Sequence, residues 1–439
     1  MSVTKHRLSR AAAVACVATV ALGTAVACSK DDGPADPGAK PEVLVIDTFG
    51  DMGFSGLAKE FEEEHGIRVE IRNTAQLGDY TPQLVRYLAT GEGAGDVVAL
   101  EEGIITRFNP ANFIDLRPYV GNIDNEYLEW KFKLGIAPNG KLFGLPTDVG
   151  SMAVCYRLDL FEEAGLPTDR DEVSALWPTW DDFIEVGKQY REATGKALLD
   201  SVTTAMSARM VQTGGEMYYT PDYQLYRGGQ EKENLVAAQS QAVKDAWDLA
   251  EKLIEADVTA KVATWSPEWT EGFKTGTFAA TLCPSWMTGI VQANSGEENA
   301  GKWDIAAVPG RSGNWGGSWL AVPVTSKYPE WAAKLARFLT DAHGQLAAFK
   351  ESGPLPTHLE VLANPDFQSY TNPYFNNAPT GKIYGETVQN IDPVVYGPRH
   401  ADIRERAMEP AARLWEQGQL TREQAFDQFL NDVPLQGSY

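Results

Sequence analysis

Residues 42–71, EVLVIDTFGDMGFSGLAKEFEEEHGIRVEI, carry the pattern of a strand, a helix and a second strand in direct succession. Residues 42–49 are a largely β-branched run of the kind that is buried on both faces of a sheet. Residues 54–65 repeat apolar side chains at helical spacing, and Gly66 is placed to cap that helix. Residues 67–71 alternate as the next strand. The segment therefore predicts a β-α-β unit.

The alternation continues in the next thirty residues. We predict a second helix over residues 79–89 and a third buried strand over residues 96–100 (DVVAL). Strands that alternate with helices through short links predict a parallel, doubly wound sheet, in which ligands bind beyond the carboxyl ends of the strands. The polar and aromatic residues that follow these strand ends are Asp51, Gln76, Asp79, Tyr80 and Glu101.

The rest of the chain alternates in the same way. Asn139-Gly140 predicts a hairpin turn, and residues 152–156 a further strand. Helices are predicted over residues 180–190, 231–256 and 329–349, and across most of residues 392–430. A mature chain of about four hundred residues is long for one core, which suggests two lobes.

Tryptophan is concentrated in one region. Of the 12 tryptophans in the chain, residues 264–319 contain Trp265, Trp269, Trp286, Trp303, Trp315 and Trp319. Indoles beside the Gly316-Gly317 pair suit a concave site, because a pyranose ring stacks its C–H groups on an indole face while its hydroxyls bond around the edge. The alternative is that these side chains fill the core. We interpret the region as a sugar-binding cleft.

The N-terminus has the features of an export signal. Basic residues precede an apolar run over residues 11–27, which is short for a membrane-spanning helix. Ala25-Val26-Ala27-Cys28 resembles a bacterial lipobox, which implies a signal peptide over residues 1–27 and a lipid on Cys28. Residues 28–40, rich in Pro, Gly and Asp, would form a flexible tether. An ordinary Ala-x-Ala cleavage site is the alternative. We expect an exported protein anchored to the outer face of the cell membrane.

Net charge and cysteine content limit the ligands and cofactors that the protein is expected to bind. A net charge of -22 opposes binding to nucleic acid and disfavours anionic ligands. Once Cys16 leaves with the signal and Cys28 takes the lipid, Cys155 and Cys283 remain, and in an exported protein they are a natural disulfide pair. Two buried free thiols are the alternative. No cysteine or histidine pair has metal-ligand spacing, so we expect neither a metal nor a cofactor.

The order of these segments resembles the extracellular solute-binding proteins of ABC importers, in the carbohydrate-binding cluster that includes maltodextrin-binding protein. The resemblance covers the whole mature chain. Besides the lipobox, it is carried by residues 60–69 (EFEEEHGIRV), 91–98 (GEGAGDVV), 140–148 (GKLFGLPTD), 273–286 (FKTGTFAATLCPSW), 317–323 (GSWLAVP) and 353–356 (GPLP).

The resemblance implies an α/β, periplasmic-binding-protein-like fold, with two doubly wound lobes joined by a hinge and the ligand cleft between them. Chain crossings are expected near residues 147–154 and 320–324 and at Gly353. One lobe would comprise residues 41–148 and 321–352, and the other residues 149–320 and 353–439.

The resemblance also suggests roles for single residues. Trp286 occupies the position of a sugar-stacking aromatic, and Tyr396 is the nearest match to a second one, with Arg399 as a hydroxyl donor. Asp51 and Asp148 would accept paired hydrogen bonds from vicinal hydroxyls. The tryptophan region adds four more residues to the predicted site, Trp265, Trp315, Gly317 and Trp319.

One departure from the family pattern bears on the ligand. The maltodextrin pattern has a tryptophan just after the third strand, where this chain has Leu100-Glu101-Glu102. The difference argues against maltose-like stacking and favours a different oligosaccharide. The density of indoles suggests two or three rings, as in a β-linked or xylan-type di- or trisaccharide. The family implies delivery of the sugar to the transmembrane subunits of an ABC permease, by a protein that is not an enzyme and that we expect to be a monomer.

Other functions fit the sequence less well. A glycoside hydrolase needs a pair of flanking carboxylates, and no spacing marks such a pair. Tyr218-Tyr219 would suit an iron-binding relative, although packing or a sugar contact accounts for them better. His343 and His400 lack a nucleophile partner in any motif. A peptide ligand stays open, and a polyamine is the main alternative, because carboxylates and indoles together form a cage for cations.

Overall fold

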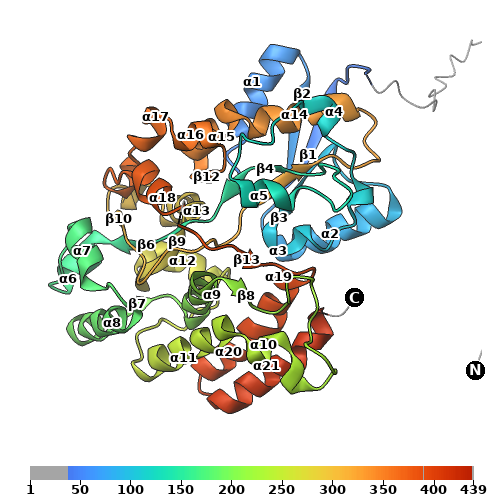
Figure 1. Cartoon of the computed structure of the whole chain (residues 1–439). Helices are drawn as coiled ribbons and strands as arrows, with labels where there is room; N and C mark the ends of the chain where they lie inside the picture. The colour runs from blue at the N-terminus through green and yellow to red at the C-terminus, as the bar shows by residue number, and fades with distance from the viewer. Residues whose placement is uncertain (1–37, 389, 438–439) are drawn as a thin grey trace, which may run out of the picture. The chain divides into compact units, whose positions relative to one another are not determined.

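The computed structural model describes residues 38–388 and 390–437, which form two mixed sheets with helices packed around them (Figure 1). The predicted signal peptide, Cys28 and most of the predicted tether lie outside the described residues. Within the described ranges, no helix combines the length and apolar character needed to cross a membrane.

The first lobe is built on a five-stranded sheet in the order β2-β1-β3-β11-β4. Its strands are β1 (Val43–Phe49), β2 (Arg68–Thr74), β3 (Val97–Glu101), β4 (Leu145–Pro146) and β11 (Ser318–Ala321). Strand β1 pairs in parallel with both β2 and β3, whereas β11 runs antiparallel to β3 and β4. The parallel unit predicted from residues 42–100 is therefore confirmed.

The second lobe is built on a four-stranded sheet in the order β10-β6-β9-β7. Its strands are β6 (Met152–Arg157), β7 (Ala197–Leu199), β9 (Phe278–Pro284) and β10 (Trp303–Ala306). The β7–β9 pair is parallel and the other two pairs are antiparallel. Two short ribbons pair β5 (Asp148–Val149) with β12 (Leu355–Pro356) and β8 (Gly215–Glu216) with β13 (Val394–Val395).

Helices cover both sheets (Figure 1). Those of the first lobe are α1 (Ser55–His65), α2 (Leu77–Thr90), α3 (Glu102–Ile105), η1 (Pro110–Asn112), α4 (Arg117–Val120), α5 (Glu129–Leu134), α14 (Pro329–Thr340) and α15 (Ala342–Ser352). The helices of the second lobe that lie between β6 and β10 in the chain are α6 (Leu158–Glu163), α7 (Arg170–Leu176), α8 (Trp180–Thr194), α9 (Val202–Thr213), η2 (Lys232–Asn234), α10 (Val236–Gln239), α11 (Gln241–Glu255), α12 (Pro267–Thr275), α13 (Met287–Ser295) and η3 (Glu297–Asn299). The C-terminal ones are α16 (Leu359–Leu362), α17 (Pro365–Gln368), η4 (Pro373–Phe375), α18 (Thr380–Val388), α19 (His400–Ile403), the π-helical turn η5 (Arg404–Met408), α20 (Glu409–Glu416) and α21 (Arg422–Gly437).

The central strands of both sheets are buried on both faces, and their sequences show it. Along β3, Val97 and Ala99 join one apolar cluster, and Val98 and Leu100 join another on the opposite face. Successive side chains of a strand point to opposite faces, so an uninterrupted apolar run is what a doubly covered strand requires. Strand β6 divides its side chains between two clusters in the same manner.

Two helices predicted as continuous are each broken in the structure. The helix predicted over residues 231–256 is interrupted at Ser240, whose hydroxyl accepts a hydrogen bond from the backbone N–H of Val243 and starts α11. The helix predicted over residues 329–349 breaks at Asp341, whose carboxylate caps α15 at Gly344. Ser and Asp side chains compete with the helical ladder for backbone N–H groups, and here they begin new helices.

The chain passes between the two sheets at three places, within residues 147–151, 307–317 and 353–354. The ribbon of β5 and β12 joins the first and third passages, and Gly353 turns the chain with a φ of 90° after α15. The lobe boundary predicted at Ala321 falls inside β11, because that strand begins at Ser318 and belongs to the first sheet.

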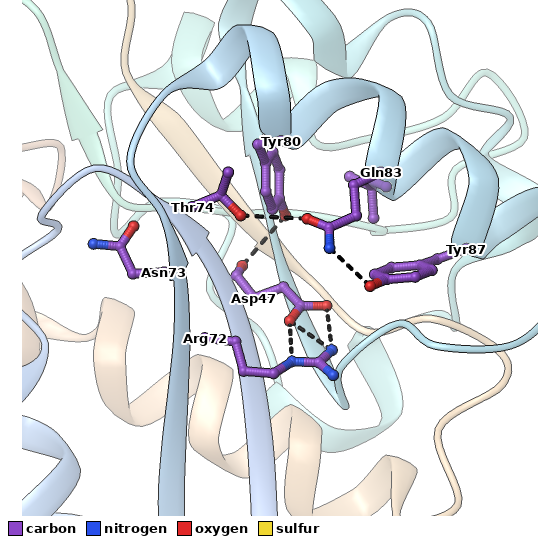
Figure 2. Close-up of a pocket in the computed structure, with 8 residues that line it drawn as sticks. Asp47, Arg72, Asn73, Thr74, Tyr80, Gln83 and Tyr87 are labelled. Atoms are coloured by element: carbon purple, nitrogen blue, oxygen red, sulfur yellow. Dashed lines mark hydrogen bonds and ion pairs between the residues drawn. The ribbon is translucent and has the colours of Figure 1, made fainter.

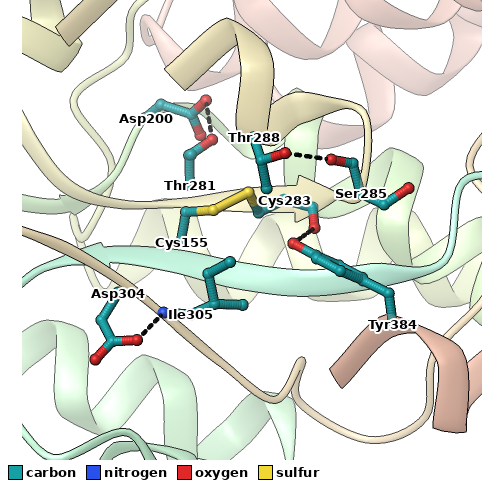
Figure 3. Close-up of a disulfide and its surroundings, with 9 residues drawn as sticks. All are labelled: Cys155, Asp200, Thr281, Cys283, Ser285, Thr288, Asp304, Ile305 and Tyr384. Carbon is teal, nitrogen blue, oxygen red and sulfur yellow. Dashed lines mark hydrogen bonds between the residues drawn. A yellow bond between two sulfur atoms is a disulfide. The ribbon is translucent and has the colours of Figure 1, made fainter. Parts of the chain in front are cut away.

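The predicted disulfide between Cys155 and Cys283 is confirmed, and it links the neighbouring strands β6 and β9 (Figure 3). Both cysteines are fully buried. The phenol of Tyr384 donates a hydrogen bond to the carbonyl of Cys283 over 3.0 Å, so α18 is tied to the same strand. The disulfide therefore lies in the core of the second lobe, and one of its cysteines belongs to β9, the strand that leads to Trp286.

Candidate ligand-binding site

A cavity of about 480 Å³ is lined by residues of both lobes. The first lobe contributes residues at or just after the ends of three strands: Phe49, Gly50 and Asp51 at β1, Ala75 and Gln76 at β2, and Glu101 at β3. The carboxyl ends of parallel neighbouring strands meet at one edge of a sheet, which brings these three loops together. The predicted wall at the strand ends therefore exists as a cavity wall.

Three indoles form the opposite wall. Trp265, Trp286 and Trp315 all line the cavity. The rings of Trp265 and Trp286 are nearly parallel, with 17° between their planes and 6.4 Å between centroids, and the ring of Trp315 stands at 89° to that of Trp286. Trp265 is 43% exposed, so a broad apolar surface faces the cavity mouth. Such a surface suits a ligand with flat apolar faces.

Local structure holds each indole in place. Trp286 lies two residues after the end of β9 and is the N-cap residue of α13, and its indole N–H donates to the carbonyl of Trp315 over 3.0 Å. Trp265 adopts a φ of 68°, and the next residue, Ser266, caps α12 by accepting from the N–H of Trp269. A left-handed backbone is unusual for a bulky residue, and such strain is found most often at functional sites.

The chain between Asn314 and Ser318 approaches other backbone so closely that glycine is needed. Gly317 has a φ of 112°, and a Cβ there would lie 2.3 Å from the carbonyl oxygen of Asp148. Gly150 is packed against Trp315, whose N–H donates to the Gly150 carbonyl over 2.8 Å. Without side chains, these residues let Trp315 and the crossing strands pack together.

A buried ion pair supports this turn from below. Lys131 of α5 bonds to the carboxylate of Glu102, and its ammonium also donates to the carbonyl of Gly316 over 3.2 Å. Asn314 donates to the same carboxylate over 2.7 Å. The Lys131 ammonium lies 4.0 Å from the ring centre of Trp319. Burial raises the pKa of Glu102, and the nearby ammonium opposes that rise.

Two aspartates line the cavity with at least one oxygen already engaged. Asp51 accepts from the N–H of Gly53 through one oxygen and from the hydroxyl of Ser352 through the other. Asp148 accepts from Thr147 and from the N–H of Ser318, both through Oδ1. Burial raises the pKa of the Asp148 carboxyl. Asp148 is therefore oriented by the protein, and no hydrogen bond from the described part of the chain reaches its Oδ2.

The C-terminal helices contribute charged residues that the sequence analysis did not select. Arg404 and Glu405 of η5, and Glu409 of α20, line the cavity. Arg404 donates to Glu405 over 2.8 Å and lies 3.6 Å from the carboxylate of Glu409. Single π-helical turns are rare in proteins, and those that occur are often found at functional sites. The amphipathic pattern of residues 392–430 predicts a helix but does not show where such a turn lies.

Burial sets the protonation of this cluster. It raises the pKa of Glu101 to about 7, against the opposing effect of Arg404, and it raises the pKa of Glu409 to about 7 in the same way. Although burial alone lowers the pKa of Arg404, the carboxylates of Glu405, Glu409 and Glu101 hold it above its ordinary value. The cavity therefore contains one firmly charged guanidinium and two carboxyls that titrate near neutral pH.

Helix α9 supplies three more polar residues that were not predicted, Thr203, Thr204 and Ser207. They occupy the first turns after the cap Ser201, at the end of the loop from β7. A strand followed by Asp200-Ser201 and a helix is the same strand-to-helix arrangement that identified the sites in the first lobe. This strand-to-helix pattern could therefore have identified Thr203, Thr204 and Ser207 as site residues from the sequence.

Eight of the predicted site residues line the cavity and five do not. The eight are Asp51, Gln76, Glu101, Asp148, Trp265, Trp286, Trp315 and Gly317. Gln76 also reaches across to the second lobe, where its amide lies 3.5 Å from the carbonyl of Trp265. The five others, Asp79, Tyr80, Trp319, Tyr396 and Arg399, have different environments.

Three of those five are held by internal bonds. Trp319 is fully buried in β11, and its indole N–H donates to the carbonyl of Lys131. The buried Tyr396 donates to the carbonyl of Asn314 over 3.0 Å, and so supports the turn before Trp315. Arg399 bonds to Asp402. Asp79 is exposed in the first turn of α2.

Tyr80 borders a second, smaller cavity of about 220 Å³ (Figure 2). Its hydroxyl donates to the carbonyl of Ala99 over 2.9 Å, and the ring is buried. The floor of that pocket is a two-point ion pair in which Arg72 bonds to both oxygens of Asp47, at 2.6 and 2.8 Å. The two charged groups that line this pocket are therefore paired with each other.

The tyrosines that an iron site would need are also in the core. Tyr218 and Tyr219 are buried in the main apolar cluster of the second lobe, and neither lines the larger cavity. Among the residues that the structure describes, no group of His, Cys, Asp and Glu is arranged to hold a metal ion.

Comparison with known proteins places the chain among binding proteins. The family described as bacterial extracellular solute-binding protein matches residues 56–375. The lactose-binding protein of Rhizobium radiobacter is 30% identical over 183 residues, a match that spans 41% of this chain and 39% of that protein. The arabinooligosaccharide-binding protein of Halalkalibacterium halodurans is 25% identical over 324 residues, covering 70% of this chain and 67% of that protein.

Solved structures share the whole fold. A crystal structure described as extracellular solute-binding protein family 1 aligns with a TM-score of 0.75 at 33% identity, and covers 91% of this chain and 100% of that one. The fold described above is therefore found in a related protein that aligns over its full length.

Proposed function

Because the chain belongs to the bacterial extracellular solute-binding protein family, we propose that it captures an oligosaccharide in the cavity between its two sheets and delivers it to the permease of an ABC importer. The observation that carries the proposal is that one cavity combines an indole wall with oriented carboxylates from the strand ends. The indoles are Trp265, Trp286 and Trp315. The lactose and arabinooligosaccharide named for two relatives support a sugar as the ligand.

The cavity size supports a ligand of two or three rings rather than a polymer. A volume of about 480 Å³ accommodates a small oligosaccharide, with room for water at its edges. The indoles would stack against the C–H faces of the rings, while Asp148 and Glu101 accept bonds from hydroxyls. A β-linked or xylan-type di- or trisaccharide remains our proposal, because Glu101 and Glu102 stand where the maltodextrin pattern has a tryptophan.

Closure of the lobes on the sugar would generate the signal that the permease reads. The three chain passages between the sheets would serve as the hinge, and the bond between Gln76 and the backbone of Trp265 is one that opening would break. A ligand shifts such an equilibrium only by its difference in affinity for the two states, so a sugar that contacts both walls favours closure.

Anchoring through Cys28 is a separate part of the proposal. The family implies export, and the Ala-Val-Ala-Cys sequence implies lipid attachment. Metabolic labelling with a radioactive fatty acid, followed by detergent phase partition, tests it. Label on the wild-type protein and its loss in Cys28→Ser support the anchor. Unlabelled wild-type protein would remove it.

The function is tested by thermal shift and intrinsic tryptophan fluorescence of the mature protein against sugars. The panel contains xylo-, cello-, arabino- and malto-oligosaccharides, lactose and other galactosides, with spermidine, a tripeptide mixture and ferric iron as non-sugar ligands. A ligand that binds only the folded state raises the melting temperature. A shift with one sugar series supports the proposal and identifies the linkage. A shift with spermidine or peptide alone would transfer the site to that ligand class.

The alternative that the protein is a glycoside hydrolase is tested on the same preparation. Incubation with chromogenic glycosides of the sugar that binds should leave them intact, since the proposed role is binding and release. Turnover that is lost in Asp148→Asn or Glu101→Gln would show that the cavity carboxylates perform hydrolysis.

A further inference from the structure

The lining of the larger cavity is unbalanced in charge. Its ionisable residues are Asp51, Glu101, Asp148, Arg404, Glu405 and Glu409, so five carboxyls face one guanidinium. Lys131 lies nearby, but its ammonium is bonded to Glu102 and to the carbonyl of Gly316. The only cation that lines the cavity within the described ranges is therefore shared among several acids.

That guanidinium is already engaged. Arg404 bonds to Glu405 and lies beside Glu409. Among the residues that the structure describes, no hydrogen bond reaches Oε1 of Glu101, whose other oxygen accepts from Gly103. The same holds for Oδ2 of Asp148, since both of its bonds end on Oδ1. Both side chains are more than nine-tenths buried.

Unpaired carboxylates are costly in a buried site, and a protein can relieve that cost by keeping a proton. In the empty cavity, burial raises the pKa of Glu101 and of Glu409 to about 7, and raises that of Asp148. A neutral sugar would displace water and leave this excess negative charge without a counterion. A ligand cation would replace the missing positive charge directly.

Two further features suit such a ligand. Trp265 and Trp286 present nearly parallel ring faces at the same cavity, and indole faces attract cations. Ser207 of α9 lines the cavity with a buried hydroxyl that has no hydrogen-bond partner among the described residues. Ser207 adds a polar residue to the second-lobe lining of the cavity, which also includes Arg404.

We propose that the sugar bound in this cavity carries at least one protonated amine, which Glu101 and Asp148 receive while the indoles stack on the ring. The inference rests on the proposed function, because it names the class of sugar for the same cavity. It differs from polyamine binding in requiring the ring as well as the charge.

The test compares sugars that differ only in whether a hydroxyl or an amine stands at C2 of each ring. Calorimetric titration of the mature protein at pH 7.5 uses three pairs: glucose and glucosamine, galactose and galactosamine, and cellobiose and its 2,2′-diamino analogue chitobiose. N-acetylglucosamine, N-acetylgalactosamine and N,N′-diacetylchitobiose serve as the forms with the amine neutralised. We expect one amine to bind about tenfold or more tightly than both its hydroxyl and its acetylated partner.

Each outcome decides between the two proposals. If neutral sugars of the wider panel bind and no amine binds more tightly than its partner, the amino-sugar inference is wrong and the proposed function stands. If no sugar binds at all, both fail. Binding of spermidine equal to that of the best amino sugar would also overturn the inference, because the ring would then add nothing.

Variants locate the amine. In Glu101→Gln and Asp148→Asn the preference for the amine over the hydroxyl partner should fall at least several-fold, while binding of the neutral sugar changes less. The amide oxygen of each variant can still accept the backbone hydrogen bond that the carboxylate accepts in the wild type, from Gly103 to residue 101 and from Ser318 to residue 148. Glu129→Gln, an exposed acid on α5 outside the cavity lining, is the matched control and should keep the preference. An undiminished preference in both cavity variants would overturn the assignment.

Discussion

The indole N–H of Trp286 donates to the backbone carbonyl of Trp315 over 3.0 Å, so the one polar atom of this side chain is satisfied within the protein. Both flat faces of the ring are left for contacts with its surroundings. The bond joins the end of β9 to the turn between the two sheets, and it fixes the orientation of an indole that is only partly buried. A preformed aromatic platform costs less entropy on binding than a mobile one.

Truncation of that platform should weaken sugar binding. We expect Trp286→Ala to weaken affinity for the best sugar at least about tenfold, because it removes the stacking surface and frees the carbonyl of Trp315. Titration calorimetry measures the loss, and circular dichroism checks the fold. Trp331→Ala, which removes a partly buried indole of α14 outside the cavity lining, is the control and should keep full affinity. Unchanged affinity in Trp286→Ala would remove this residue from the site.

Glycine at position 317 should be essential for the same reason of close packing. In Gly317→Ala the new Cβ would lie 2.3 Å from the carbonyl oxygen of Asp148 and 2.5 Å from the Lys131 ammonium. We expect a loss of about 2 kcal/mol or more of stability and weaker sugar binding, measured by denaturant unfolding and titration. Gly310→Ala separates the two causes, because Gly310 has a φ of 78° with no heavy atom near its Cβ position. Equal effects in both variants would point to backbone strain alone.

The buried pair of Lys131 and Glu102 yields a prediction with an internal rescue. Lys131→Met leaves the Glu102 carboxylate buried without its counterion, which typically costs about 3–5 kcal/mol. Adding Glu102→Gln removes that charge and keeps an oxygen for the amide of Asn314, so most of the stability should return. Urea unfolding of the two variants and the wild type measures this. A double variant no more stable than Lys131→Met would show that the ammonium acts through packing instead.

The disulfide should contribute stability without shaping the site. Replacing Cys155 and Cys283 together by alanine should lower the free energy of unfolding by about 2–4 kcal/mol, since the bond closes a chain segment with a sequence separation of 128. Sugar affinity at 20 °C should stay within about twofold of the wild type, because neither cysteine lines the cavity. A large loss of affinity with little loss of stability would contradict this division of roles.

Stability should fall as pH rises through neutrality, in part because of Glu409. Burial raises the pKa of Glu409 from 4.5 to about 7, so the folded protein holds this proton more tightly than the unfolded chain. The resulting stability is complete below about pH 4.5 and is lost as pH rises to about 7, by roughly 1–3 kcal/mol. Glu409→Gln should flatten that part of the curve, measured by urea unfolding from pH 5 to 8.

The control for the pH experiment is Glu255→Gln, which removes an exposed acid at the end of α11. Its curve should run parallel to that of the wild type. A Glu409→Gln curve with the wild-type slope would mean that the carboxyl is ionised in the empty cavity at neutral pH, and that Arg404 compensates its charge fully.

Several features follow from local sequence alone. The strand and helix periods of residues 42–100 define the β-α-β-α-β unit, and the parallel pairing of β1 with β2 and β3 agrees with them. Because loops after parallel strands share one edge, Asp51, Gln76 and Glu101 could be placed at the cavity from spacing. The partnership of Cys155 and Cys283 also followed, because no other cysteine was left to pair.

Tertiary structure decided the rest. Trp265, Trp286 and Trp315 line the cavity, whereas Trp269, Trp303 and Trp319 in the same region are fully buried. Nothing local distinguishes these indoles, because burial depends on which distant segments pack over them. Arg404 and Glu409 lie more than three hundred residues after Glu101 in the chain, and only the packing of the C-terminal helices brings their charges to the same cavity. Periodicity is encoded over a few neighbouring residues, while a binding site is assembled by contacts between segments that are far apart in sequence.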